Sequence, residues 1–315
     1  MKQTILKAYK AFRNMLYKSN NKPSARAYLL LKLLERQITS GNYSFVTLDE
    51  LFLWTEDWIK SFPETYDLIV GIPRSGLLVA NIIALKLGKP LTTPELLIQD
   101  KNWMSKCIKS NKKIKHVLLV DDSITGGKTM IKYLKLIKSH NKNLKITTAA
   151  LIATKESKSQ VDLNYKVIYH PRLFEWNLLH SPKGIIATDL DGVLCENCPE
   201  GTDSNEEKYL VWIKTAKPYL IPAFEIDTII SCRLEKYRVE TEHWLKKNKV
   251  KYKKLVLWNL LSKQERMGKN AKYKISELLR VKPDMFFESS KIEAARIWMM
   301  TTIPTLCVDE MVLFD

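Results

Sequence analysis

The sequence predicts an α/β chain of two domains, each a mainly parallel sheet flanked by helices. Three observations lead to this prediction. Short apolar runs typical of buried strands alternate with helical patterns along most of the chain. A length of 315 residues is enough for two hydrophobic cores. A polar break, His180-Ser181-Pro182-Lys183, interrupts the alternation, which then starts again. We therefore expect domains at 1–180 and 183–315.

Composition and charge narrow the class of protein. The chain is 45% hydrophobic and 27% charged, which is typical of a globular protein. No apolar run reaches the roughly 20 residues that cross a bilayer, and charges interrupt residues 1–16, so we expect a cytoplasmic protein. The net charge of +17 predicts attraction to anions. We do not expect nucleic acid as a partner, because no helix-turn-helix, zinc-finger or RNA-recognition signature is present.

Helical patterns cover the N-terminal part of the chain. Residues 1–20 form an amphipathic pattern with lysines and arginines outside the apolar face. This helix either packs on its own domain or contacts an anionic membrane at its inner, cytoplasmic face. Further helices are expected over 24–39 and 48–61.

The stretch from 115 to 129 predicts a sugar-phosphate site. An apolar strand at Val117–Val120 runs directly into Asp121 and Asp122, whose carboxylates can accept hydrogen bonds from a vicinal diol. A phosphate-binding turn at a helix start comes next. Its residues are Ser123, Thr125, Gly126, Gly127, Lys128 and Thr129. A Walker loop is excluded, because Asp122 stands where that motif needs a glycine.

A second phosphate-binding turn is expected earlier in the chain. A strand at 68–72 is followed by a turn that offers backbone amides and a guanidinium before a helix at 77–87, which suits a diphosphate. The residues of this turn are Arg74, Ser75 and Gly76. Another strand is expected at 146–153, with Lys155 just beyond it as a further diphosphate contact, and a short strand is expected at 167–169.

These two stretches resemble the PRPP-binding loop and the diphosphate loop of the type I phosphoribosyltransferases, where PRPP is phosphoribosyl diphosphate. The resemblance implies that family's fold, with PRPP and Mg²⁺ bound and Asp121 and Asp122 facing the ribose hydroxyls. Residues 123–129 would hold the 5-phosphate. The family usually has threonine where this chain has Gly126, so a backbone contact replaces one hydroxyl.

Two other segments correspond to parts of that family. The lysine-rich segment 99–115 lies where the family has a mobile loop that closes over the reacting sugar. Residues 170–176 lie where related transferases form a hood over the acceptor. Phe174 and Trp176 in this segment either stack on the acceptor or belong to the core, and the sequence leaves both open.

A second constellation begins after an expected strand at 184–188. Asp189 and Asp191, separated by one residue, point to the same side of the chain and can share Mg²⁺, one acting as nucleophile and the other as acid and base. Further polar residues follow at the end of a strand, at a helix start and at the end of a later strand. They are Ser231, then a lysine at the start of the helix, and finally Glu288. Lys272 is our choice of lysine, and Lys274 is nearly as good.

This order resembles the haloacid dehalogenase superfamily of phosphatases. The resemblance implies a Rossmann-like fold in which Asp189 attacks phosphorus and Asp191 protonates the leaving alcohol. Ser231 and Lys272 would hold the phosphoryl oxygens, and Asp189, Asp191 and Glu288 would bind Mg²⁺. Ser289 stands where the family often has a second acid. The short stretch before Ser231 leaves no room for a large cap, which predicts an open site and a large substrate.

The two resemblances together predict a bifunctional ribofuranosyltransferase. It would transfer 5-phosphoribosyl from PRPP to a lipid-linked glycan, as in bacterial surface polysaccharide and O-antigen assembly, and then remove the 5-phosphate. This combination of domains is similar to the transferase–phosphatase pairs that have been proposed to add ribofuranose to such glycans. Two alternatives stay open: nucleoside or modified-base biosynthesis, and a PRPP-binding regulator without catalysis. The sequence does not indicate the oligomeric state.

Overall fold

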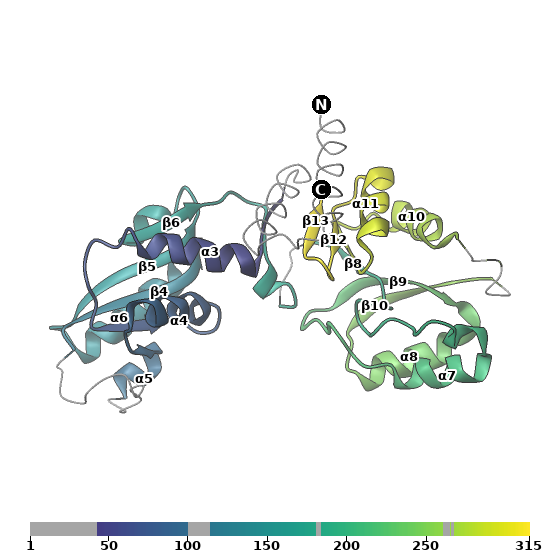
Figure 1. Ribbon diagram of the computed structural model, residues 1–315, viewed down its shortest axis with the longest axis horizontal. Coiled ribbons are helices and arrows are strands. Elements are labelled where there is room, and N and C mark those ends of the chain that lie inside the picture. The colour runs from purple at the N-terminus through teal and green to yellow at the C-terminus, as the bar shows by residue number, and fades with distance from the viewer. Residues whose placement is uncertain (1–42, 100–113, 181–183, 261–264, 266–267) are drawn as a thin grey trace, which may run out of the picture. The chain divides into compact units, whose positions relative to one another are not determined.

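The computed structural model describes residues 43–99, 114–180, 184–260, 265 and 268–315. The helices expected over 1–39 and most of the lysine-rich segment lie outside these residues. The described residues fall into two compact units, one of residues 44–176 and one of residue 43 with 177–315 (Figure 1). No helix in the described part of the chain is long and apolar enough to cross a bilayer.

The first unit is a five-stranded parallel sheet in the order β3-β2-β4-β5-β6, with a separate parallel pair, β1 and β7. Its elements in chain order are β1 (Ser44–Val46), α3 (Leu48–Ile59), β2 (Leu68–Gly71), α4 (Gly76–Leu87), β3 (Leu91–Thr92), α5 (Pro94–Ile98), β4 (His116–Ile124), α6 (Lys128–His140), β5 (Lys145–Ala153), β6 (Leu163–Val167) and β7 (Arg172–Phe174).

Helices cover both faces of this sheet because the side chains of β4 alternate between two cores. Leu118 and Val120 pack with α3 and α4, whereas Val117 and Leu119 pack with α6. A capping box starts α3, in which the Thr47 side chain accepts from the backbone N–H of Glu50 and the Glu50 side chain accepts from that of Thr47.

The strand order reverses direction between β2 and β4. The chain goes from β2 to β3 on one side and then to β4 on the other side of β2, so the connections after β2 and β4 leave in opposite directions. In open parallel sheets such a switch point, at the carboxyl ends of the strands, is where ligands bind.

The second unit is a six-stranded sheet in the order β10-β9-β8-β11-β12-β13, parallel except for the last pair. Its elements are β8 (Ile186–Thr188), α7 (Glu206–Thr215), β9 (Ile226–Leu234), α8 (Arg238–Lys247), β10 (Tyr252–Trp258), α10 (Asn270–Val281), β11 (Met285–Glu288), α11 (Lys291–Thr301), β12 (Thr305–Cys307) and β13 (Val312–Phe314). Here the switch point lies between β8 and β11.

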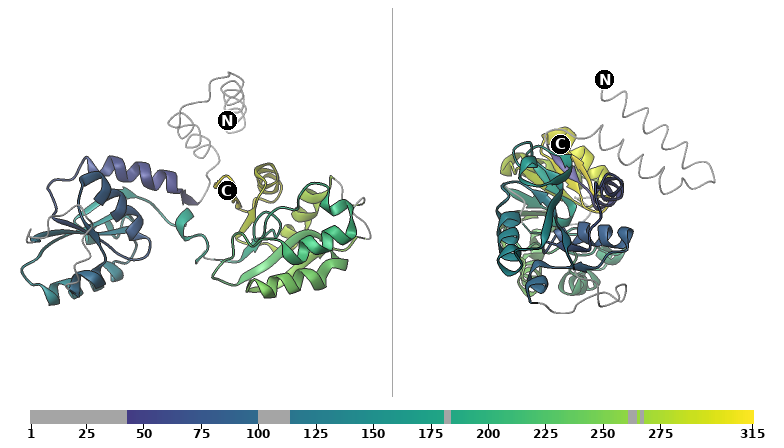
Figure 2. Two further views of the ribbon diagram at one scale, coloured as in Figure 1. Left: turned by 60° about the horizontal axis from the view of Figure 1, so that its bottom comes forward. Right: turned by 90° about the vertical axis from the view of Figure 1, so that its left-hand side faces the viewer.

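This sheet also separates two cores. Leu255 and Leu257 of β10 pack with α7 and α8, and Val256 packs on the opposite face with α10 and α11. Figure 2 shows the two helix pairs on either side of the strands. The connection between β8 and β9 holds one helix, α7, and a short 3₁₀ turn, so it forms no large cap.

The predicted fold class is confirmed as α/β with mainly parallel sheets, and two strands need correction. β4 continues to Ile124, because it pairs with β5 as far as Ala153, so both carboxylates lie within the strand. β6 occupies Leu163–Val167 rather than 167–169, because it pairs with β5 over that stretch. The first compact unit ends at Trp176, close to the polar break that the sequence suggested.

Candidate functional site

The switch point of the first sheet brings the two predicted phosphate-binding turns together. The backbone N–H of Ile72, after β2, donates to the Val120 carbonyl of β4 at 2.8 Å. Gly76 begins α4, and a Cβ on it would lie 2.9 Å from both the Val120 oxygen and Asp121 Oδ1. Only glycine therefore allows the N-terminus of α4 to lie against the Asp121 carboxylate.

The two carboxylates have different partners. The backbone N–H of Asp122 donates to Asp121 Oδ1 at 2.9 Å, and Trp176 Nε1 donates to Asp122 Oδ2 at 2.7 Å. Burial, and next the charge of Asp122, raise the pKa of Asp121 to about 8. Asp121 therefore carries a proton at neutral pH when no ligand is bound, and it can both donate to and accept from a sugar diol.

The turn after β4 presents backbone groups rather than side chains. Gly127 has a φ of +66° and is the cap residue of α6, so no side chain occupies the first N–H groups of that helix. A Cβ on Gly127 would also collide with Gln160. The Cβ position of Gly126 is open, so packing does not require glycine where the related family has threonine.

The other predicted residues surround this switch point at the ends of β2, β4 and β5. Arg74 is exposed and Ser75 half-buried in the first turn. Ser123, near the end of β4, is half-buried, Thr125 in the turn after β4 is exposed, and Lys128 and Thr129 at the start of α6 are also exposed. Lys155, just after β5, is also exposed.

Arg172 and Trp176 contact this site. Arg172 was not singled out from the sequence, whereas Trp176 was expected either to stack on the acceptor or to belong to the core. Arg172 donates to the Ile124 carbonyl and to Thr125 Oγ1, and its guanidinium lies 5.2 Å from the Phe174 ring centroid. Phe174 and Trp176 stack on each other with centroids 4.8 Å apart. Phe174, at the end of β7, is buried in the core of the first unit, and Trp176, in the 3₁₀ turn Glu175–Asn177, packs against the same core. The two rings therefore belong to the core, and Trp176 also contacts the predicted site through Asp122.

The sequence comparison agrees with this geometry. Residues 48–183 match the family model described as "Phosphoribosyl transferase domain". The chain therefore contains a phosphoribosyl transferase domain. No curated protein matches the chain.

Two solved structures align with this part of the chain at low sequence identity. A Helicobacter pylori xanthine-guanine-hypoxanthine phosphoribosyltransferase is 15% identical, with a TM-score of 0.36 over 44% of this chain and 95% of that one. A Pyrococcus horikoshii purine phosphoribosyltransferase is 22% identical, with a TM-score of 0.34 over 42% of this chain and 93% of that one.

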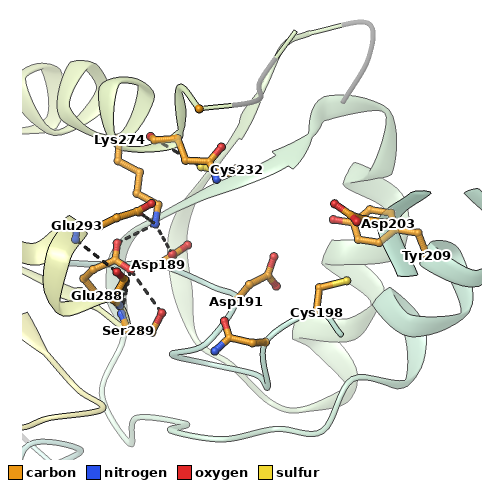
Figure 3. Close-up of a pocket in the computed structure, with 14 residues that line it drawn as sticks. Asp189, Asp191, Cys198, Asp203, Tyr209, Cys232, Lys274, Glu288, Ser289 and Glu293 are labelled. Atoms are coloured by element: carbon orange, nitrogen blue, oxygen red, sulfur yellow. Dashed lines mark hydrogen bonds and ion pairs between the residues drawn. The ribbon is translucent and has the colours of Figure 1, made fainter. Parts of the chain in front are cut away.

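A second polar site lies at the switch point of the second unit, and we call it the Lys274 pocket (Figure 3). It has a volume of about 460 Å³. Lys274 Nζ, from α10, donates to Asp189 Oδ2 at 2.6 Å, to Glu288 Oε2 at 2.7 Å and to Glu293 Oε2 at 2.9 Å. Lys272, the first choice from the sequence, lies on the exposed side of α10, whereas Lys274, the near-equal choice, lines the pocket.

Burial and neighbouring charges together determine the charge state of the ionisable groups in this pocket. Burial raises the pKa of Asp189 to about 7, against the opposing effect of the Lys274 charge. Burial alone would lower the pKa of Lys274, but Asp189 and Glu288 outweigh it and hold that pKa well above its ordinary value. Lys274 is therefore a permanent cation that bridges these acids.

Asp191 is held by an arginine that the sequence analysis did not single out. Arg233 Nη2 and Nε donate to Asp191 Oδ1 at 2.6 Å and 3.0 Å, and the Arg233 side chain is fully buried. The guanidinium also lies 4.9 Å from the Trp212 ring centroid. Ser231 is buried at the same end of β9, where its Oγ accepts from the Arg233 backbone N–H at 3.2 Å.

The predicted Mg²⁺ ligands do not form a shared three-carboxylate site. Their oxygen chemistry suits Mg²⁺. However, Lys274 bridges Asp189 and Glu288, and Asp191 is paired with Arg233. Within the described ranges no group of three histidine, cysteine, aspartate or glutamate side chains is placed to hold a metal ion. The Lys274 ammonium and the Arg233 guanidinium neutralise part of the negative charge that a bound Mg²⁺ would otherwise neutralise.

Proposed function

We propose that this chain is a bifunctional ribofuranosyltransferase. Its transferase domain moves 5-phosphoribosyl from PRPP to an acceptor, and its second unit removes the 5-phosphate as a phosphatase of the haloacid dehalogenase type. The Lys274 pocket carries the second half of this proposal. Asp189 and Asp191 line this pocket together with the buried Lys274. Glu288, the terminal acid, lines it too, and the pocket lies at the switch point of a parallel sheet.

The transferase step uses the switch point between β2 and β4. Asp121 and Asp122 hydrogen-bond the ribose hydroxyls, and the turn at 123–129 holds the 5-phosphate with its backbone N–H groups. Arg74, with Ser75, Gly76 and Lys155, holds the diphosphate. Departure of the diphosphate leaves an oxocarbenium-like ribose, which the acceptor captures once water is excluded.

The phosphatase step uses Asp189 as the nucleophile. Its carboxylate attacks phosphorus, the bond to the sugar oxygen breaks, and Asp191 gives that oxygen a proton. Water, losing a proton to Asp191, then hydrolyses the aspartyl phosphate and releases inorganic phosphate. Lys274 holds the phosphoryl oxygens, Ser231 is buried next to Arg233, and Arg233 fixes the orientation of Asp191.

A lipid-linked glycan is the acceptor that this pairing favours. Nucleotide salvage needs the 5-phosphate, so an enzyme that removes it is suited to placing plain ribofuranose on another molecule. The connection between β8 and β9 is short, which suits a large substrate, and the charge of +17 suits work near an anionic membrane.

Mass spectrometry of the products tests this proposal. Wild type and Asp189→Asn are incubated with PRPP and Mg²⁺, with a lipid-linked glycan extract in one reaction and nucleobases in another. We expect ribosyl-glycan with wild type and phosphoribosyl-glycan with the variant. Glu207→Gln, an exposed carboxylate of α7 outside the pocket, is the matched control and should behave as wild type.

The other outcomes decide between the alternatives. The same pattern on a nucleobase would move the protein to nucleoside or modified-base chemistry. PRPP binding without any adduct would support a regulator. A phosphoribosyl product that is identical for wild type and Asp189→Asn would refute the phosphatase step.

A further inference from the structure

Arg172 is a half-buried cation at the end of β4, and the proposed transfer step does not use it. Its Nη2 donates to the Ile124 carbonyl at 3.3 Å and to the Thr125 hydroxyl. Burial lowers the pKa of Arg172, but a guanidinium stays protonated at neutral pH. The structure therefore places a positive charge directly beside the turn that is proposed to hold the 5-phosphate.

One nitrogen of this guanidinium lacks a hydrogen-bond partner among the described residues. Arg172 Nη1 is buried and has no acceptor there. A buried charged donor without an acceptor is unfavourable, so a compensating charge nearby stabilises it. The Asp122 carboxylate supplies part of that charge, since it raises the pKa of Arg172. An anion bound in the adjacent turn would compensate the guanidinium further.

Thr125 is the residue through which Arg172 reaches that turn. The connection between β4 and α6 consists of Thr125, Gly126 and Gly127. Thr125 is exposed and carries the only side-chain hydroxyl of these three residues. Its oxygen accepts from Arg172, and a hydroxyl that accepts a hydrogen bond can still donate its own proton. A phosphate oxygen is a strong acceptor for that donation.

The segment that carries Arg172 contacts the site at a second point. Arg172 belongs to β7, which pairs with β1 in a sheet of its own. Further along the same segment, Trp176 donates to the Asp122 carboxylate at 2.7 Å. Residues 172–176 therefore contact both the carboxylate assigned to the ribose hydroxyls and the turn assigned to the 5-phosphate.

We propose that Arg172 is a positioning residue for the 5-phosphate of PRPP, acting through the Thr125 hydroxyl. This inference rests on the proposed transferase function. Arg172 engages the hydroxyl oxygen as an acceptor, which directs the hydroxyl proton away from the guanidinium and leaves it for a phosphoryl oxygen. The charge of Arg172 strengthens that hydrogen bond. Loss of Arg172 should therefore weaken binding of the 5-phosphate and leave binding of the diphosphate unchanged.

Equilibrium binding to the full chain tests the proposal. Calorimetry measures the dissociation constants of ribose 5-phosphate and of inorganic diphosphate at one Mg²⁺ concentration. Arg172→Gln should weaken ribose 5-phosphate binding by about tenfold, the size of one charge-assisted hydrogen bond, and change diphosphate binding by less than about twofold. Arg172→Lys keeps the charge and should lose less affinity. Lys135→Gln removes an exposed charge of α6 outside the site and is the matched control, which should bind both ligands as wild type does.

Variants of the turn test the path through Thr125. Thr125→Val removes the hydroxyl at nearly constant shape and should cost about as much affinity for ribose 5-phosphate as Arg172→Gln. The two changes together should cost no more than about twofold beyond either one, because residues that act as a unit are not additive. Gly126→Thr, at an open Cβ position, adds a hydroxyl that does not contact Arg172 in wild type. In the Arg172→Gln background it should restore ribose 5-phosphate binding by about fivefold.

The outcomes separate this inference from the proposed function. A wild type that binds neither ligand would overturn the transferase site and, with it, the inference. Unchanged ribose 5-phosphate binding in Arg172→Gln would overturn the inference and keep the transferase. Additive losses in the double variant would do the same, since Arg172 would then act independently of Thr125. An equal loss of both ligands in Thr125→Val, which changes an exposed side chain, would also overturn a role specific to the 5-phosphate.

Discussion

Asp121→Asn is expected to stabilise the transferase domain in a way that depends on pH. The pKa of Asp121 is raised to about 8 in the folded protein, first by burial and then by Asp122. In the unfolded chain an aspartate has a pKa of about 4. Between these values the unfolded chain releases a proton that the folded protein keeps, so the stability of wild type falls as the pH rises from 4 to 8.

The size of the effect follows from the shift in pKa. Each pH unit within this window costs about 1.4 kcal/mol, so the loss reaches at most about 4 kcal/mol at pH 7. Asparagine at 121 cannot ionise, and its amide oxygen can still accept from the backbone N–H of Asp122. The variant should therefore equal wild type in stability near pH 4 and exceed it increasingly toward pH 8.

Urea unfolding at a series of pH values measures this difference. The unfolding of the transferase domain can be followed by the hydrogen exchange of the backbone amides of β4, the strand that holds Asp121. Asp49→Asn, an exposed carboxylate of α3, is the control and should keep the pH dependence of wild type. A difference between Asp121→Asn and wild type that stays constant from pH 4 to 8, or that turns against the variant as the pH rises, would refute the reasoning.

Three further predictions concern the two sites. Gly126→Thr should fold as wild type and bind PRPP at least as well, because the Cβ position of Gly126 is open. Gly127→Thr should lower the free energy of unfolding by about 1–2 kcal/mol, because Gly127 has a positive φ. Calorimetry with and without PRPP measures both effects. Lys274→Met should lower phosphatase kcat by about a hundredfold and Lys272→Met should leave it unchanged, as phosphate release will show. The phosphatase rate should rise as the pH increases toward about 7 and level off above it, because Asp189 attacks as a carboxylate and its pKa is about 7; a rate that falls across this range would contradict the assignment of the nucleophile.

Local sequence patterns were enough to predict the parts of the sites that lie next to each other in the chain. The turn at 123–129 depends on the strand before it, on its glycines and on the helix after it, all within a short stretch. The same holds for Asp189 and Asp191, because alternation along an extended chain places residues two apart on one side. The alternation of strands and helices likewise determined the class of fold.

Tertiary packing alone decided which long-range partners complete each site. The helical pattern made Lys272 and Lys274 nearly equivalent, and only the packing of α10 against β9 and α11 buries Lys274 beside Asp189. The sequence likewise gave no reason to pair Arg233 with Asp191 or Trp176 with Asp122, since each pair lies more than 40 residues apart. Neighbouring residues in the chain determine where a turn forms and which side chains share a face of a strand or helix. The charge state and the partners of a buried side chain depend instead on which helices and strands pack together in the folded protein.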